Sequence, residues 1–337
     1  MKLLRYLLLP VVPIYRFVAM VRNWFFDLGV LKSKSYNFPV ICIGNLSTGG
    51  TGKTPVTEYL IRLLKDDRRL ATLSRGYGRS TKGFIQANSK STAESLGDEP
   101  FQFYSKYNED IIVAVDEKRV NGIDTLKSKN SDLDLVLLDD AFQHRYVKAG
   151  FNILLTPYDK LYVNDICLPT GNLREPISGA KRADVIIVTK CPEDLSEDLQ
   201  VKIERLLSPE SHQVVYFSHI DYANEVISSN TTRGLNSMNG VKFTLVTGIA
   251  DPSPLVSHLK SLGLDFEHQS FKDHHKFSED EITALKKKEL VLTTEKDYMR
   301  LSPYFKDEDT LFYLPIEVKL NNKDAFEDKV KDFIKTY

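Results

Sequence analysis

The chain has 337 residues, which is longer than one typical domain and enough for two. Its 45 lysine and arginine residues nearly balance its 46 aspartate and glutamate residues, so no overall positive field favours nucleic acid as a partner. The three cysteines, Cys42, Cys167 and Cys191, form no C-x-x-C pair, which argues against a zinc site or a disulfide framework and favours a reducing cytosolic compartment.

The first element, residues 1–30, is rich in leucine, valine and aromatic residues but also contains arginines and two prolines. A membrane-spanning helix needs about 20 mostly apolar residues without such interruptions, so we do not expect this segment to cross a bilayer. The arginines and the lack of a convincing cleavage site also argue against a signal peptide. The pattern is typical of an amphipathic helix on a membrane surface, with Trp24, Phe25 and Phe26 in the interface. A helix packed on the domain explains its amphipathicity equally well.

Residues 31–192 alternate short apolar runs with helical patterns, which is typical of a largely parallel sheet with helices on both faces. The runs expected to form strands are 40–43, 71–74, 111–115, 133–138, 152–155 and 185–189. A helix is expected over residues 54–65, where apolar residues recur at helical spacing. We therefore predict an α/β domain resembling the P-loop NTPases.

The pattern restarts after residue 192, and we expect residues 193–337 to form a second, smaller α/β domain. It begins with a charged helix over 195–207, followed by strands over 213–219 and 242–247. The last element, 324–337, has the pattern of an amphipathic helix, which can dock back on the core.

The segment between the first strand and the first helix has the pattern of a phosphate-binding P-loop. It consists of Ser47, Thr48, Gly49, Gly50, Thr51, Gly52, Lys53 and Thr54. Glycines let the backbone point several N–H groups at a phosphate, and the helix N-terminus adds a partial positive charge. Lys53 is expected to reach the β- and γ-phosphates, and the Thr54 hydroxyl to ligate magnesium. Ser47 stands where the strict motif has glycine; a plain glycine turn is the alternative.

Two carboxylates, Asp139 and Asp140, follow the apolar run 133–138. Because the carboxyl ends of parallel strands lie at one edge of a sheet, both should converge with the P-loop on a magnesium ion. The alternative is a strand cap followed by a turn.

Three loops contain candidates for binding phosphate or the phosphate acceptor. Arg75 and Tyr77 lie in one loop, where the guanidinium group suits phosphate but a solvated turn fits as well. Gln143 can reach a reacting phosphate, although loop glutamines more often make local hydrogen bonds. Arg174 can stabilise charge on a transferred phosphoryl group, although a loop pair such as Arg174 and Glu175 is usually a solvated ion pair.

Asp98 stands at the start of an expected helix, where a carboxylate is either a cap or a base that accepts a hydroxyl proton. The spacing alone favours the cap. His274 and His275 do not have the i, i+4 spacing of a helical zinc pair. From the residues alone a surface pair is the simpler interpretation, and a histidine that orients a carboxylate base across a domain cleft is the alternative.

Taken together, these motifs resemble the tetraacyldisaccharide 4'-kinase family of lipid A biosynthesis over most of the chain. Besides the apolar N-terminal segment and the P-loop, the resemblance rests on Gly44-Asn45-Leu46, Ser74-Arg75-Gly76-Tyr77-Gly78, Gly97-Asp98-Glu99-Pro100, Asp139-Asp140-Ala141-Phe142-Gln143-His144, Leu173-Arg174-Glu175-Pro176 and Asp273-His274-His275. The family's Ser or Thr at the first P-loop position accounts for Ser47. Ala141 departs from the family's usual glycine.

The resemblance implies phosphorylation, with ATP and Mg²⁺, of the 4'-hydroxyl of a tetraacylated glucosamine disaccharide 1-phosphate. It implies a peripheral position on the cytoplasmic face of the bacterial inner membrane, with residues 1–30 as anchor and no obligate protein partner. Asp98 and His274 become the base dyad. The remaining implied site residues are Lys53, Asp139 and Asp140 for phosphate and magnesium, Arg174 and Glu175 for catalysis, and Arg75, Tyr77, Arg119 and Gln143 for the acceptor.

Three other functions remain open on the sequence. A P-loop GTPase or ATPase switch would need an Asn/Thr-Lys-x-Asp element, and Thr189-Lys190-Cys191-Pro192 begins in this way but ends in proline. A soluble small-molecule kinase would use the N-terminal segment only as core. A membrane-surface ATPase without an acceptor would hydrolyse ATP equally well with or without lipid.

Overall fold

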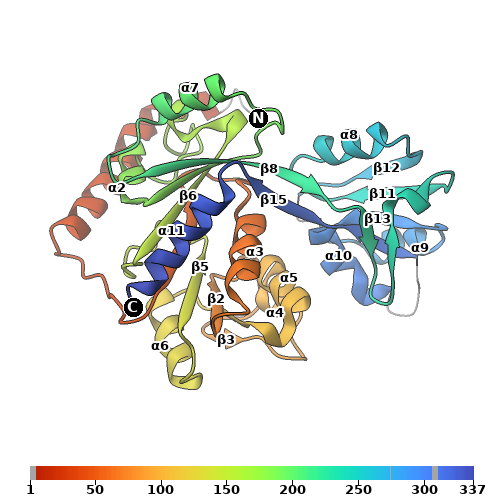
Figure 1. Ribbon diagram of the computed structural model, residues 1–337, viewed down its shortest axis with the longest axis horizontal. Helices are drawn as coiled ribbons and strands as arrows, with labels where there is room; N and C mark the ends of the chain where they lie inside the picture. Colours follow the sequence, from red (N-terminus) through yellow and green to blue (C-terminus); the bar gives the residue numbers. More distant parts are fainter. Residues whose placement is uncertain (1–4, 274, 306–309) are drawn as a thin grey trace.

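The computed structural model describes residues 5–273, 275–305 and 310–337, and within these ranges the chain forms one sheet of nine strands and one of six (Figure 1). The larger sheet contains, in spatial order, β15 (Ile316–Leu320), β8 (Val214–Tyr222), β7 (Val185–Thr189), β6 (Phe151–Pro157), β1 (Val40–Asn45), β5 (Leu135–Asp139), β2 (Leu70–Ser74), β4 (Ile112–Val115) and β3 (Ile85–Gln86). The edge strands β15 and β3 are antiparallel to their neighbours and the other strands pair in parallel.

The central strands are buried because helices cover both faces of this sheet. Strands β1, β2, β4, β5 and β7 are buried at every position, which is why their sequences are nearly continuous apolar runs. One face packs against α6 (Arg119–Lys129), α7 (Glu197–Leu207) and the inner side of α2 (Val12–Asp27). The other packs against α3 (Lys53–Leu64), α5 (Asp98–Tyr107) and α11 (Lys323–Lys335). The predicted α/β class, its strands and the helices α3, α7 and α11 are confirmed.

The smaller sheet lies beside the larger one, on the right in Figure 1. Its spatial order is β10 (Thr232–Gly234), β9 (Glu225–Ile227), β14 (Leu311–Leu314), β13 (Val291–Thr294), β11 (Phe243–Thr247) and β12 (Phe266–Ser270). Its helices are α8 (Ser253–Ser261), α9 (Glu279–Lys286) and α10 (Glu295–Leu301). Helix α8 contributes to a separate apolar core on one face, and α9 and α10 to another on the opposite face.

Shorter elements complete the described chain. They are the helix α4 (Ala93–Leu96) and the 3-10 turns η1 (Leu9–Val11), η2 (Asn108–Asp110), η3 (Tyr158–Lys160), η4 (Tyr162–Asn164), η5 (Ile177–Arg182), η6 (Leu235–Met238) and η7 (Ser302–Tyr304). Among the described helices, none is long and apolar enough to cross a membrane.

Strands β8 and β15 connect the two sheets. Both belong to the larger sheet, although they follow residue 192 in the sequence. At their ends the chain passes between the sheets, where the Ala223 amide donates to the Pro315 carbonyl at 3.0 Å. The division into 1–30, 31–192 and 193–337 stays a prediction, and we propose that the two α/β units separate at this crossing rather than at residue 192.

Helices α5 and α10 bring the two units together through charged side chains. Lys106 on α5 lies 2.7 Å from Glu58 of α3 and 2.6 Å from Glu295 of α10. Gln102 donates to the other oxygen of Glu58 at 2.8 Å. The Glu58 and Glu295 side chains are almost fully buried. Lys106 therefore connects the P-loop helix α3 to the smaller unit through two ion pairs that are largely shielded from water.

Glu295 should make stability depend on pH. Burial, with Glu58 nearby, raises the pKa of Glu295 to about 7. Between the ordinary pKa of glutamate and this value the folded state binds more protons than the unfolded state, so stability falls as pH rises from 5 to 8. We expect Glu295→Gln to remove this loss, on the order of 2 kcal/mol, because glutamine stays neutral. Thermal unfolding of both proteins at pH 5 and pH 8 measures it; parallel pH dependences would contradict the assignment.

Candidate active site

The candidate active site lies at the carboxyl edge of β1, in the middle of the larger sheet. Strand β1 pairs with β5 on one side and β6 on the other, so the loop that follows it stands where the strand order reverses. Gly49 and Gly52 in this loop have φ values of 108° and 84°, in the left-handed region that glycine adopts without strain. The loop then enters α3 at Lys53. This is the strand, loop and helix arrangement that the P-loop pattern predicts.

The loop fits a phosphate ligand. The buried Thr51 Oγ1 has no hydrogen-bond partner among the described residues, and Lys53 begins a helix whose N-terminus favours anions. Lys53 Nζ lies 3.4 Å from Asn45 Oδ1 and 3.6 Å from Asp140 Oδ1. Thr189 Oγ1 donates to the Thr51 carbonyl at 2.8 Å and holds the loop against β7. Thr54 is the second residue of α3.

The first half of the loop is fixed to the segment that contains Arg174. The Thr48 amide donates to the Asn172 carbonyl at 2.8 Å, and Ser47 forms a bridge with Leu173. The Arg174 amide donates to the Leu46 carbonyl at 2.7 Å. These backbone contacts place the Arg174 side chain beside the P-loop.

Asp139 and Asp140 occupy different electrostatic environments although they are adjacent. Asp139 ends β5, is buried, and lies 3.4 Å from Thr57 Oγ1 and 3.3 Å from Ser74 Oγ. Burial, followed by the charge of Asp140, raises the pKa of Asp139 to about 6. Burial also opposes the ionisation of Asp140, but the charges of Lys53 and Arg174 hold its pKa below the usual value. An ionised carboxylate beside a P-loop is a ligand that Mg²⁺ accepts together with phosphate oxygens.

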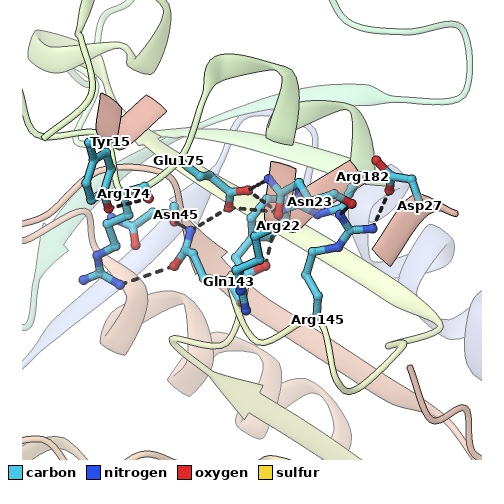
Figure 2. A network of polar contacts seen from close by, with 11 residues as sticks. Tyr15, Arg22, Asn23, Asp27, Asn45, Gln143, Arg145, Arg174, Glu175 and Arg182 are labelled. Carbon is cyan, nitrogen blue, oxygen red and sulfur yellow. Dashed lines mark hydrogen bonds and ion pairs between the residues drawn. The ribbon is translucent and has the colours of Figure 1, made fainter. Parts of the chain in front are cut away.

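Arg174, Gln143 and Glu175 form a polar network next to this pair (Figure 2). Arg174 NH1 lies 3.0 Å from Asp140 Oδ1 and 3.5 Å from Gln143 Oε1. Gln143 Nε2 donates to Glu175 Oε1 at 2.9 Å, and Arg182 donates to both oxygens of Glu175. The alternative, a solvated ion pair between Arg174 and Glu175, is not found among the described contacts. Arg174 bonds Asp140, while the buried Glu175 bonds Arg182.

The predicted acceptor-binding residues differ in their exposure to solvent. Arg119 begins α6 with only 1% of its surface exposed, and its NH1 donates to the Asp116 carbonyl at 2.6 Å. Burial lowers the pKa of Arg119 to about 10, while Asp139 and Asp140 act in the opposite direction, so this guanidinium lies within their electrostatic range. Arg75 and Tyr77 lie on an exposed loop after β2, and Tyr77 is 79% exposed.

Asp98 is the first residue of α5 and faces the smaller unit. Its carboxylate forms an ion pair with Arg300 of α10, which also lies 3.2 Å from the buried Asp297. The next residue, Glu99, lies 3.3 Å from Lys296. His274, the predicted partner of Asp98, lies outside the described residues.

His275, the other histidine of that segment, serves the smaller unit. Its Nε2 lies 3.0 Å from Glu281 Oε2, and its ring stacks on Phe271 with 4.6 Å between centroids.

Four residues of the site were not singled out from the sequence. Asn45 contacts Lys53, Thr57 and Ser74 contact Asp139, and the charge of Glu99 acts on the pKa of Asp139. Asn45, Ser74 and Glu99 stand within motifs that carry the family resemblance, which is the signal for them. Thr57 lies one helical turn after Thr54, so helical spacing from the P-loop would have found it.

Comparisons with known proteins agree with this geometry. A sequence model of the tetraacyldisaccharide-1-P 4'-kinase family, LpxK, matches residues 4–335. The tetraacyldisaccharide 4'-kinases of Flavobacterium psychrophilum and Flavobacterium johnsoniae are 49% and 47% identical to the chain, covering 100% and 99% of it and 98% of each relative. A crystal structure of the "apo" form of LpxK from Aquifex aeolicus in complex with ATP matches with a TM-score of 0.81 and 30% identity, covering 98% of this chain and 99% of that one.

Proposed function

The chain belongs to the tetraacyldisaccharide-1-P 4'-kinase family, and on this premise we propose how its site works. It transfers phosphate from ATP to the 4'-hydroxyl of a tetraacylated glucosamine disaccharide 1-phosphate, a step of lipid A biosynthesis. The observation that carries our assignment of residues is the convergence of Lys53, Asp140 and Arg174 at the carboxyl edge of β1. Two cations beside one carboxylate suit a site that neutralises phosphate charge while it holds a metal.

We assign residues 47–54 to the phosphates of ATP. Their backbone N–H groups and Thr51 Oγ1 hold the phosphates, and Lys53 neutralises charge on the β- and γ-phosphates. Thr54, Asp139 and Asp140 would hold Mg²⁺, which would supply positive charge to neutralise the phosphate oxygens during transfer. Arg174, held by Asp140 and Gln143, stabilises charge on the transferred group.

The acceptor hydroxyl needs a group that takes its proton, and we assign this role to Asp98. As the 4'-oxygen attacks the γ-phosphorus, its proton moves to an oxygen of the Asp98 carboxylate and the bond from the γ-phosphorus to the bridging oxygen of ADP breaks. Arg300 holds the carboxylate from the smaller unit. His274 as the second member of the dyad stays a proposal. Arg75, Tyr77, Arg119, Gln143 and Glu175 complete the acceptor side in this assignment.

We propose that α2 and the turn before it contact the lipid surface on which the acceptor resides. Large apolar side chains there are exposed on one side of the helix: Ile14, Phe17, Val18, Met20, Trp24 and Phe25. Arg16 is exposed among them. Phe26, expected in the interface with Trp24 and Phe25, is instead buried against Tyr146. Exposed apolar and basic groups on one helix are typical of binding in the plane of an anionic membrane surface. We propose with it the peripheral position on the cytoplasmic face of the inner membrane that the family resemblance implies.

Replacing Trp24 and Phe25 together by serine should weaken binding to vesicles containing anionic phospholipid by roughly tenfold or more, because both side chains lose apolar surface that enters the interface. Sedimentation of the protein with sucrose-loaded vesicles measures this. The matched control is Leu262→Ser with Tyr304→Ser, two exposed apolar side chains of the smaller unit. Equal loss in both double variants would contradict a specific role of α2.

The reaction is tested by following labelled γ-phosphate from ATP into the tetraacyl disaccharide 1-phosphate in detergent micelles. Labelled lipid, formed only when acceptor is present, is the expected result. Release of labelled phosphate at one rate with or without the lipid would instead support an ATPase or nucleotide switch. A variant lacking residues 1–22 tests the remaining alternative, a soluble small-molecule kinase that uses the N-terminal segment only as core. Loss of vesicle binding with an intact fold supports a surface anchor, and general unfolding supports a core helix.

A further inference from the structure

The lipid-facing helix is connected to the phosphate site by a series of polar contacts. Figure 2 shows its first part, from Asn23 through Glu175 and Gln143 to Arg174. Asn23 Nδ2 on α2 donates to Glu175 Oε2 at 2.8 Å, and Gln143 Nε2 donates to the other oxygen of Glu175 at 2.9 Å. Gln143 Oε1 faces Arg174, which bonds Asp140. The last link is the ion pair between Asp140 and Lys53 of the P-loop. Asn23 thus lies at one end of a network whose other end holds the phosphate-binding lysine.

Glu175 depends on Asn23 for part of its hydrogen bonding. Its side chain is buried, and each of its oxygens accepts from two donors: Oε1 from Gln143 and Arg182, and Oε2 from Asn23 and Arg182. A buried carboxylate that loses one donor moves toward the donors that remain, since water is not at hand to replace the bond. Loss of the Asn23 amide therefore shifts Glu175.

Gln143 transmits this shift because its amide has one orientation. Its two N–H groups are used by Glu175 and by the Asn45 carbonyl, at 2.9 and 2.8 Å. The amide oxygen must then point toward Arg174. A displaced Glu175 releases the amide, and Arg174 loses the acceptor that holds it beside Asp140.

Further contacts fix α2 to the same loops and leave its outer side free for lipid. Tyr15 Oη donates to the Arg174 carbonyl at 2.8 Å, and Arg22 donates to the Gln143 carbonyl at 3.1 Å. Arg145 donates to the Asn23 carbonyl and forms an ion pair with Asp27 at 2.6 Å. The polar inner side and the exposed apolar outer side therefore belong to one rigid helix, and a displacement of one is a displacement of the other.

We propose that Asn23 is a positioning residue of the phosphoryl-transfer site, through which α2 sets the placement of Arg174 and Asp140. The proposal rests on the proposed function, namely a lipid acceptor and the roles of Arg174 and Asp140. It makes the N-terminal helix part of the catalytic architecture as well as a contact for lipid.

Asn23→Ala should lower kcat about tenfold in detergent micelles, where vesicle binding is not required, and leave KM for ATP within twofold. Asn23→Asp, which conserves volume but places a second carboxylate against Glu175, should lower kcat more than alanine does. Asn23→Gln, which keeps an N–H donor, should recover part of the activity. The matched control is Asn130→Ala, which removes a half-buried amide that donates to the Leu126 carbonyl away from the site.

A double variant separates positioning from a general structural effect. If Asn23 acts through Arg174, Asn23→Ala should lower kcat less than twofold further in an Arg174→Ala background, because coupled residues are not additive. Thermal unfolding midpoints identify variants that fail to fold, and Tyr15→Phe then provides a milder test, with a twofold to fivefold lower kcat expected.

Two outcomes overturn the proposal alone: kcat within twofold of wild type for both Asn23→Ala and Asn23→Asp, or full multiplication of the Asn23 and Arg174 effects. No transfer to the lipid by the wild-type protein would instead overturn the proposed function and this inference with it.

Discussion

Replacement of Lys53 by alanine is expected to lower kcat/KM for ATP by about 10³-fold. The ammonium group begins α3, lies between Asn45 and Asp140, and is the cation nearest to the place where phosphate binds in a P-loop. Its loss leaves the developing charge on the β–γ bridging oxygen without its protein partner, and it leaves Asp140 with Arg174 alone. Steady-state kinetics with labelled ATP and the acceptor lipid measure the effect.

The fold should survive this change, because the Lys53 side chain is not part of either apolar core. Lys65→Ala is the matched control, since it removes a lysine at the other end of the same helix that pairs with Asp66 and Asp110 near the surface. Lys65→Ala should retain turnover within twofold. An Lys53→Ala protein that keeps more than a tenth of wild-type kcat/KM, with an unchanged unfolding midpoint, would contradict the assignment of the P-loop as the phosphate site.

The parts of this molecule that the sequence predicts are those decided by neighbouring residues. The parallel strands are recognisable because burial on both faces requires continuous apolar runs, and the P-loop because glycines and a lysine occupy fixed positions between a strand and a helix. Asp139 and Asp140 could be placed at the site for a similar reason, since all parallel strands end at one edge.

The contacts that complete the site are not predictable from local patterns. Asn23 and Glu175 are 152 residues apart, and Asp98 and Arg300 are 202 residues apart. Helical periodicity shows that residues 12–27 form an amphipathic helix, but it does not name the partner on either side. The membership of β8 and β15 in the larger sheet could not be predicted for the same reason, because a strand pattern predicts that a strand exists but not which sheet it joins.

The second large effect is expected at Asp98. Asp98→Asn should lower kcat by about 10²- to 10⁴-fold, because asparagine keeps the shape of the side chain but cannot accept the hydroxyl proton. KM for ATP should change little, since the Asp98 carboxylate pairs with Arg300 of α10 on the side of the smaller unit. The measurement is acceptor-dependent transfer of labelled phosphate at saturating ATP.

Asp324→Asn provides the matched control, because Asp324 is likewise an acidic residue in the first turn of a helix but is exposed and far along the chain from the site. It tests the loss of a favourable charge at a helix N-terminus, which is worth about 0.3–1 kcal/mol of stability and should not change kcat. If Asp98 were only such a cap, both variants would lose the same small amount of stability and keep their turnover.

Arg300 decides how the Asp98 result is to be interpreted. The Arg300 guanidinium on α10 bonds Asp98 and also forms an ion pair with the buried Asp297. The orientation of the proposed base therefore depends on the smaller unit being docked on α5. Arg300→Lys keeps the positive charge but cannot bond Asp98 and Asp297 in the same way. It should lower kcat by about tenfold, because Asp98 is then less well oriented to accept the hydroxyl proton. Combining it with Asp98→Asn should add almost nothing, because the group that Arg300 orients no longer takes a proton. Independent losses in the double variant would assign Arg300 to holding the two units together instead of to the orientation of the base.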